Sequence, residues 1–290
     1  MNELRSIEQI MAPPAPHWVG NAFRVHNFFP GNLDLKRMSP FFLLDYGSKI
    51  EFPPTETPRG VGVHPHRGFE TVTIVYHGKV AHHDSAGNSG VIEEGDVQWM
   101  TAASGVLHKE YQEEAWSKKG GLVQMAQIWV NLPAKDKMSA PKYQPLKQRD
   151  FAHYVLPDAQ AEIEVIAGNY RGIKGKASTF TPIDMYNAYV KAGADVSFSF
   201  PRDYNTAFLV VEGNVLLNGA EVPTDHFVLF ANDGTDIQLK SNEEAIVLVL
   251  SGEPINEPIA SYGPFVMNTK QEILDAYDDL NKGKFGYLDD

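Results

Sequence analysis

Short runs of apolar and β-branched residues recur along the chain, separated by glycine, asparagine and aspartate. They lie at residues 70–76, 97–100, 122–132, 207–212, 214–217, 226–230 and 245–250. Runs of this length between turn residues are typical of the strands of β-sandwiches and β-barrels. The pattern therefore predicts an all-β fold, in which Asn218-Gly219 is the clearest hairpin turn.

The spacing of these runs also suggests the domain organisation. The two halves of the chain share a rhythm of strand, turn and strand, which indicates a duplicated β-barrel unit. Between them, residues 136–147 are polar, interrupted by prolines and without apolar periodicity. We predict an N-terminal domain at residues 1–135, a linker at 136–147 and a C-terminal domain at 148–290.

One segment near the C-terminal end departs from the β pattern. Thr269 and Glu272 have the spacing of a capping box and precede an apolar stripe, and Gly283 is a suitable stop. We expect a short helix here that packs against a barrel.

The composition limits the classes of function. The 290 residues suffice for about two domains, and a net charge of −12 disfavours direct binding to nucleic acid. The chain has no cysteine, so disulfides and thiolate sites are excluded and any metal must be held by nitrogen and oxygen. Residues 1–11 are too polar for a signal peptide, and no apolar run is long enough to cross a membrane. We expect a cytoplasmic monomer.

Two short motifs carry the chemistry. His64 and His66 stand at positions i and i+2, and so do His108 and Glu110. In an extended strand such side chains point to the same face, about 6–7 Å apart. Two strands of this kind facing each other would bring three imidazoles and one carboxylate to one point. That donor set suits a divalent transition metal and leaves coordination positions for a substrate or dioxygen.

The sequence around these residues resembles the two motifs of the cupin superfamily. The first matches H-x-H-x3-E and ends at Glu70, and the second matches only the final G-x2-H. Longer strings, among them HPHRGFETVT, GDVQWMTAASGVLHKE and GEPINEPIASYGPFVMNT, are similar to the pirin family from about residue 41 to the C-terminal helix. The resemblance implies two tandem cupin (jelly-roll type) β-barrels, and the second half contains no H-x-H for a metal site.

The pirin resemblance also implies a ligand set. The metal positions of the family match His64, His66, His108 and Glu110, which would hold one divalent metal. Glu70 stays open as an alternative ligand or as a residue that supports one. We expect Fe(II), with Mn, Ni, Cu and Zn as alternatives, because metal availability decides which ion fills a site of nitrogen and oxygen donors.

Several neighbouring residues have two open interpretations. His82 and Asp84 form either a polar strand end or a hydrogen-bonding support for a ligating imidazole. Arg67 is expected to pair with a carboxylate such as Glu70 rather than to bind a substrate. The candidates for either barrel core or pocket wall are Phe69, Trp129, Gln124 and Gln127.

Two functions from different classes follow from the pirin resemblance. The first is a quercetin 2,3-dioxygenase-type activity on a small aromatic substrate. In it the metal chelates a flavonol through adjacent oxygens, Glu110 accepts the hydroxyl proton, and dioxygen attacks the ring. The second is a non-catalytic metal-binding regulatory protein that acts on a protein partner, either a transcription factor or a metabolic enzyme. An enzyme needs an open cavity beside the metal, whereas a binding protein can close it.

Overall fold

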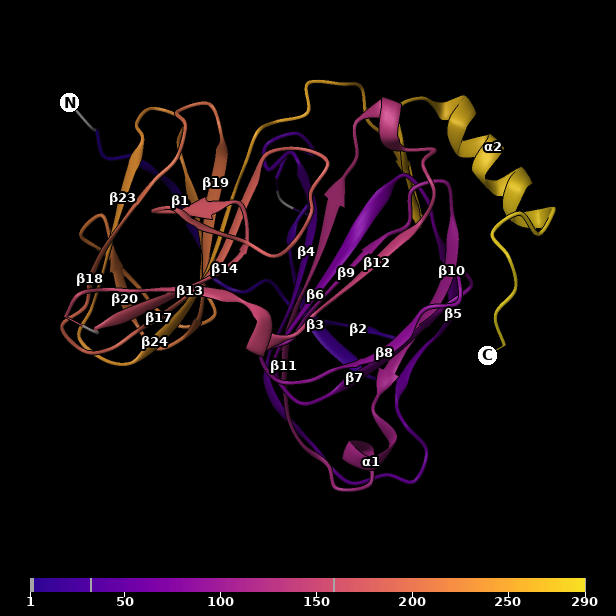
Figure 1. Ribbon diagram of the computed structural model, residues 1–290, viewed down its shortest axis with the longest axis horizontal. Helices are drawn as coiled ribbons and strands as arrows, with labels where there is room; N and C mark the ends of the chain where they lie inside the picture. Colours follow the sequence, from indigo (N-terminus) through magenta and orange to yellow (C-terminus); the bar gives the residue numbers. More distant parts are fainter. Residues whose placement is uncertain (1–2, 32, 159, 290) are drawn as a thin grey trace. The chain divides into compact units, whose positions relative to one another are not determined.

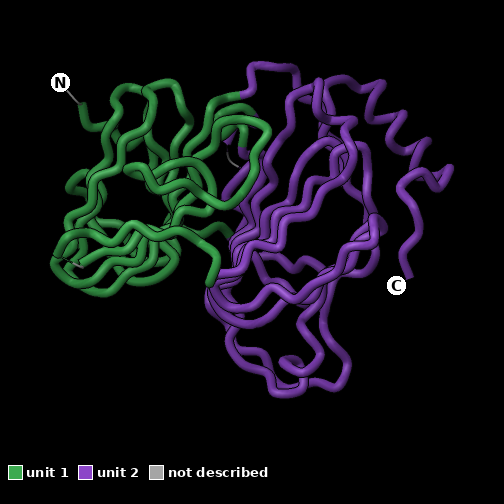
Figure 2. The backbone as a smooth tube through the Cα atoms, in the orientation of Figure 1, with its two compact units in different colours: residues 1–14, 36–40, 149–254 green, residues 15–35, 41–148, 255–290 purple. Residues whose placement is uncertain are grey.

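The chain folds into two compact units that interleave along the sequence. The structure is a computed structural model that describes residues 3–31, 33–158 and 160–289. Figure 2 shows the two units in different colours: unit 1 consists of residues 1–14, 36–40 and 149–254, and unit 2 consists of residues 15–35, 41–148 and 255–290. The continuous domain limits expected from the sequence stay a prediction.

Unit 2 is built from two antiparallel sheets, labelled in Figure 1. Within the described residues, the larger sheet has the strand order β12 (Lys142–Leu146), β9 (Val97–Thr101), β6 (Phe69–His77), β11 (Gly121–Asn131), β4 (Phe41–Phe52), β3 (Phe23–Phe29) and β2 (His17–Val19). The smaller sheet has the order β5 (Gly60–His66), β10 (Val106–Gln112), β7 (Val80–Asp84) and β8 (Ser89–Ile92). Along β10 buried and half-exposed residues alternate, so one face of this strand looks into the unit.

The remaining elements of unit 2 lie at its C-terminal end and in its connections. They are the hairpin β25 (Ala260–Tyr262) and β26 (Phe265–Met267), the helices α1 (Glu114–Ser117) and α2 (Lys270–Asn281), and the 3-10 turn η1 (Ala134–Asp136). A second 3-10 turn, η2 (Gln148–Asp150), lies where the chain passes to unit 1. Helix α2, yellow in Figure 1, packs on the β25–β26 hairpin through Ile273 and Ala276.

Unit 1 has the same two-sheet plan. Within the described residues, its larger sheet has the order β1 (Ile7–Met11), β22 (Phe227–Phe230), β19 (Asn205–Glu212), β24 (Ala245–Gly252), β17 (Ile183–Val190), β14 (Ala161–Ala167) and β13 (Ala152–Val155). The smaller one has the order β18 (Asp195–Ser199), β23 (Asp236–Ser241), β20 (Val215–Leu217) and β21 (Ala220–Val222). A short hairpin joins β15 (Asn169–Tyr170) to β16 (Ile173–Lys174). Aromatic and aliphatic side chains from both sheets fill the core between them.

The structure confirms the all-β, double-barrel prediction. It also confirms the hairpin: β20 and β21 pair across Asn218 and Gly219, which both have positive φ. At the N-terminus of α2 the side chain of Thr269 accepts a hydrogen bond from the backbone N–H of Glu272. The Glu272 carboxylate in turn accepts one from the backbone N–H of Thr269, as a capping box requires. Within the described residues, no helix has the length and apolar character needed to cross a membrane.

The segment expected to be a linker is partly a strand. Residues 142–146 of that segment form β12, which pairs with β9 at the edge of the larger sheet of unit 2. Pro145 is compatible with this position because an edge strand leaves one row of backbone groups unpaired. The polar, proline-containing composition that suggested a linker is thus also the composition of an edge strand.

Candidate metal centre

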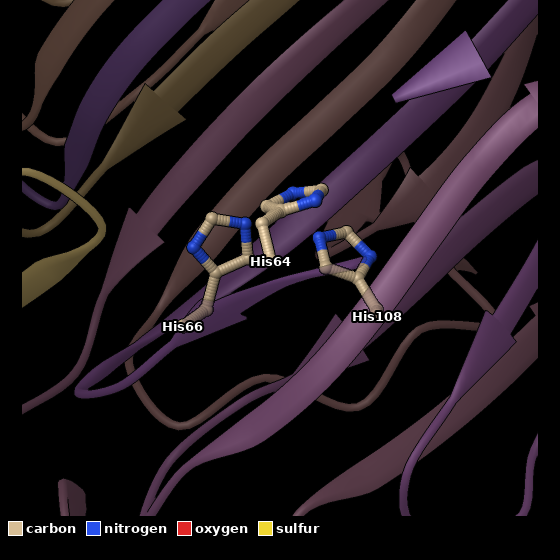
Figure 3. A group of neighbouring side chains, drawn as sticks. All are labelled: His64, His66 and His108. Carbon is tan, nitrogen blue, oxygen red and sulfur yellow. The ribbon is translucent and has the colours of Figure 1, made fainter. Parts of the chain in front are cut away.

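Three imidazoles converge in unit 2. His64 and His66 come from β5 and His108 from β10, and Figure 3 shows the three rings gathered at one place. The ring centroids are 4.9 Å apart for His64 and His66, 4.2 Å for His64 and His108, and 4.7 Å for His66 and His108. One nitrogen from each ring lies within 4.8 Å of those of the other two. Among the described residues, groups of this kind lie only in unit 2.

The pairing of β5 with β10 explains this convergence. The two strands are antiparallel neighbours, and His108 stands directly opposite His64 while Val106 stands opposite His66. Residues directly opposite share a face of the sheet, and His64 and His66 share it by strand alternation. The strands that carry the motifs are therefore neighbours in one sheet, and the three imidazoles converge although the strands lie side by side.

The state of His108 is the strongest indication that this group holds a metal. His108 is 0% exposed, and neither of its ring nitrogens has a hydrogen-bond partner among the described residues. A buried polar group without a partner costs free energy. A metal ion ligated by His108 would remove that cost, so the residues present fit the metal that the sequence implies.

The other two imidazoles are already oriented for ligation. His64 Nδ1 is 2.8 Å from the carbonyl oxygen of Gly62, and His66 Nδ1 is 3.4 Å from that of Pro264. A carbonyl oxygen can only accept a hydrogen bond, so Nδ1 is the N–H donor in both rings and Nε2 keeps its lone pair. Metal-binding histidines use this arrangement to set the tautomer and the ring orientation.

The electrostatic surroundings favour neutral imidazoles. Burial, and then the neighbouring His64 ring, lower the pKa of His66 well below its usual range. Burial followed by the His66 and His64 rings does the same to the pKa of His108. Neutral imidazole is the form that binds a metal, so the cluster needs no proton release from these two residues.

Glu110 lies on the same strand but in a second group of donors. A β-bulge displaces the register of β10 against β5 between His108 and Glu110, and Glu110 pairs with His82 of β7 on its other side. Its carboxylate therefore lies with His82 and His108, all three within 4.8 Å of one another. Thr73 Oγ1 is 3.4 Å from Glu110 Oε1. His108 is thus the residue common to both groups.

His82 has its own hydrogen-bond partners. It is fully buried, Gln98 Nε2 is 3.0 Å from its Nδ1, and its Nε2 is 3.4 Å from Asp84 Oδ2. The ring centroids of His82 and His108 are 5.4 Å apart. The interpretation of His82 as a polar strand end does not fit, because its side chain is fully buried. The interpretation as a support for a ligating imidazole fits only in part, because its hydrogen bonds go to Gln98 and Asp84.

Glu70 points away from this site. Thr73 faces Glu110, and Glu70 precedes it by three positions on β6, so the two side chains lie on opposite faces of the strand. Glu70 is buried there, and Thr101 Oγ1 donates to its Oε1 at 2.7 Å. Its position does not favour the alternative in which Glu70 is a ligand.

Arg67 forms an ion pair with a carboxylate, as the sequence leads us to expect, but its partner is Asp279 and not Glu70. Arg67 Nη1 lies 2.9 Å from Asp279 Oδ2 of α2, and Arg67 Nε donates to the carbonyl oxygen of Ser104 at 2.7 Å. Arg67 stands at the turn between β5 and β6, where the C-terminal helix is within reach and the outer face of β6 is not.

A cavity of about 320 Å³ lies beside the imidazoles. Three of the proposed ligands line it, namely His64, His66 and Glu110, and its other walls come from Val19, Phe23, Val25, Asp45, Val61, Met125, Gln127 and Trp129. A concave and mostly apolar space with a few converging polar groups is typical of small-molecule sites. The ring of Trp129 stacks on Phe69, with centroids 4.2 Å apart, and meets His66 edge-on at 5.1 Å.

The candidate wall residues thus divide by position. Trp129 and Gln127 line the cavity, whereas Phe69 is fully buried behind Trp129. Gln124 is buried and donates to the Tyr46 hydroxyl at 2.8 Å. Sequence reasoning did not single out Asp45, although a lone carboxyl inside the apolar run FFLLDY is a detectable feature.

Comparisons with known proteins agree with this architecture. Residues 22–130 match the family model described as Pirin, and residues 185–286 match the Pirin C-terminal cupin domain. A Pseudomonas aeruginosa protein with the provisional name quercetin 2,3-dioxygenase is 46% identical over 269 residues, which cover 93% of this chain and 94% of that protein. A pirin-like protein of Solanum lycopersicum is 38% identical over 264 residues, covering 89% of this chain and 85% of that protein.

A solved structure matches over the whole chain. The crystal structure of quercetin 2,3-dioxygenase from Acinetobacter baumannii is 42% identical in sequence and superimposes with a TM-score of 0.93. The match covers 99% of this chain and 100% of that one.

Proposed function

The chain belongs to the pirin family, and on that premise we propose that it is a metal-dependent dioxygenase that cleaves flavonol-type, quercetin-like substrates. Similar proteins from Pseudomonas aeruginosa and Acinetobacter baumannii carry quercetin 2,3-dioxygenase names, which supports an oxidoreductase. The substrate class rests on the site itself.

The observation that carries this proposal is the cavity beside the imidazoles. A protein that only senses a metal can bury it, but His64, His66 and Glu110 line a space of about 320 Å³. Its largest aromatic wall is Trp129, which offers a flat apolar surface to a ring. These features suit an aromatic molecule with polar groups that reach the metal.

We assign the metal ligands to His64, His66, His108 and Glu110. A divalent metal ion held there would supply Lewis-acid chelation of the substrate's adjacent hydroxyl and keto oxygens and the redox chemistry that dioxygen requires. The ion we propose is Fe(II), although Mn, Ni, Cu and Zn also accept nitrogen and oxygen donors.

The protein residues have distinct roles in this proposal. His64 and His66 hold their orientation through the carbonyl oxygens of Gly62 and Pro264, and burial favours the neutral form of His66 and His108. Glu110, the one basic oxygen donor of the set, accepts the proton of the substrate hydroxyl. Trp129 orients the aromatic ring and keeps water away from one side of it.

The test is metal analysis of the purified protein, followed by oxygen uptake with quercetin after loading with Fe(II). We expect His64→Ala to lose bound metal while circular dichroism shows an unchanged fold. We expect Glu110→Gln to lower kcat by at least about 100-fold, since a general base contributes 10²–10⁴. Glu51→Gln, an exposed change on β4, is the matched control and should behave as the wild type.

Two outcomes would overturn parts of the proposal. Full metal stoichiometry in His64→Ala would show that the ligand assignment is wrong. Bound metal without oxygen uptake in the wild type would exclude this dioxygenase activity and favour the regulatory function that acts on a protein partner.

A further inference from the structure

A row of polar side chains crosses the inner face of the larger sheet of unit 2. Five residues pair in order across β3, β4, β11, β6 and β9: Asn27, Asp45, Gln127, Thr73 and Gln98. Directly paired residues of antiparallel strands share a face. Because Thr73 Oγ1 reaches Glu110 Oε1 at 3.4 Å, the row faces the same space as Glu110.

The two ends of the row have different surroundings. At one end Gln98 is bonded to His82 and Thr73 to Glu110, so these side chains belong to the metal centre. At the other end Asp45 and Gln127 line the cavity, among the apolar side chains of its walls. Only this second end is available to a molecule in the cavity.

Asp45 and Gln127 have unused hydrogen-bonding capacity. Asn27 Nδ2 donates to Asp45 Oδ1 at 2.8 Å, while Asp45 Oδ2 has no hydrogen bond to any described residue. The side-chain amide of Gln127 likewise has no hydrogen-bond partner among the described residues. Burial raises the pKa of Asp45, against the opposing bond from Asn27, so the carboxyl lies in a poorly solvated place. Polar groups in such a place are stabilised by a partner.

Strand geometry gives the separation of Asp45 from Thr73, the residue that contacts Glu110. Asp45 pairs with Gln127, and Gln127 pairs with Thr73, so two strand spacings separate Asp45 from Thr73. Each spacing is about 4.8 Å, which places Asp45 about 10 Å across the sheet from the residue that touches Glu110. A molecule that spans this distance is about as long as two aromatic rings.

We propose that Asp45 and Gln127 form a distal subsite that binds a hydroxyl group on the far ring of an aromatic substrate whose near end meets the metal. This inference rests on the proposed function and adds a requirement to it. The substrate carries a hydrogen-bond donor on the ring remote from its chelating oxygens, and Asp45 Oδ2 accepts that hydrogen bond while Gln127 orients the same group. Asp45 is then a specificity-determining residue.

The test compares two 3-hydroxyflavones that differ only in hydroxyl groups on the ring remote from the 3-hydroxy-4-keto group. Oxygen uptake gives kcat/KM for each on the Fe(II)-loaded protein, and quenching of tryptophan fluorescence gives each Kd. We expect the wild type to prefer the hydroxylated compound by about 10- to 100-fold, the discrimination that a hydrogen bond to a charged acceptor provides.

Asp45→Asn is the decisive variant. The hydrogen bond from Asn27 Nδ2 would keep the new side-chain oxygen at the position of Oδ1. The NH₂ group, which is a donor, would then take the position of Oδ2 and could not accept the substrate's hydrogen bond. We expect the preference to fall below about three-fold. Gln127→Leu should reduce it as well and provides the test if Asp45→Asn does not fold. Glu51→Gln, on the same strand but exposed, should keep the wild-type preference.

The two readouts separate this inference from the proposed function. Equal kcat/KM and Kd for both compounds in the wild type, or full preference retained in Asp45→Asn, would overturn the subsite and leave the dioxygenase intact. Absence of binding by either compound would also overturn it. A preference in Kd that Asp45→Asn abolishes, without any oxygen uptake, would support the subsite and exclude the dioxygenase.

Discussion

Replacing Glu70 by glutamine is expected to stabilise the protein above neutral pH. Glu70 is 1% exposed, Thr101 donates to its Oε1, and its Oε2 has no hydrogen-bond partner among the described residues. Burial raises the pKa of this carboxyl from 4.5 to about 7, although the Thr101 bond opposes the shift. At alkaline pH the folded protein therefore holds a poorly compensated buried carboxylate.

The size of the effect follows from the pKa shift. Between pH 4.5 and about 7 the folded protein keeps a proton on Glu70 that the unfolded chain has released. The free energy of unfolding therefore falls as the pH rises through this window and stays lower above it. At about 1.4 kcal/mol for each pKa unit, the loss amounts to about 3 kcal/mol. Glutamine cannot ionise, so Glu70→Gln avoids this loss.

Urea unfolding of wild type and variant at about pH 5 and about pH 8.5 measures the effect. The difference in unfolding free energy between the two proteins should shift by about 3 kcal/mol in favour of Glu70→Gln between these pH values. Glu51→Gln, which is exposed, should show no such shift. The Glu70→Gln protein should also bind metal with full stoichiometry, because Glu70 faces away from the imidazoles.

A constant difference, within about 0.5 kcal/mol at both pH values, would refute the reasoning that a buried proton resides on Glu70. Loss of metal in Glu70→Gln would refute its placement outside the metal centre, and would restore it as a ligand candidate.

Two further predictions concern elements recognised in the sequence. Gly219→Ala should lower the melting temperature by about 2–4 °C, equivalent to about 1 kcal/mol. The cause is backbone strain, because Gly219 has φ +86° and an added Cβ would contact no other atom. A thermal scan checks this, and an unchanged melting temperature would contradict the type of turn. Thr269→Ala should cost about 1 kcal/mol by removing the cap of α2, with Lys270→Ala as its control in the same scan; equal effects of the two changes would argue against the cap.

Much of the fold could be predicted because its determinants are local. The strands at residues 70–76 and 122–132 are recognisable from β-branched and apolar residues alone, and they correspond to β6 and β11. The sequence could not show that residues 142–146, inside the expected linker, form a strand, because an edge strand and a linker share polar residues and proline. The interleaving of the two units could not be foreseen either, since it depends on pairs such as Ile7 with Phe230.

The candidate site could be predicted in part for the same reason. The spacing of His64 and His66 is sufficient to place both imidazoles on one face of a strand. It does not specify the neighbouring strand, so it could not show that β5 and β10 are adjacent or that a bulge moves Glu110 toward His82. The partner of Arg67 could not be predicted either, because Asp279 lies 212 positions further along the chain.

The sequence by itself determined which face of its strand each side chain takes, where the Asn218-Gly219 turn and the α2 cap form, and which four residues are the metal-ligand candidates. These properties depend on backbone geometry over a few residues. Only the tertiary structure decided that Glu70 is turned away from the imidazoles and that Asp45 lines one cavity together with His64 and His66. Those properties depend on the pairing and register of strands far apart in the chain, which local alternation leaves undetermined.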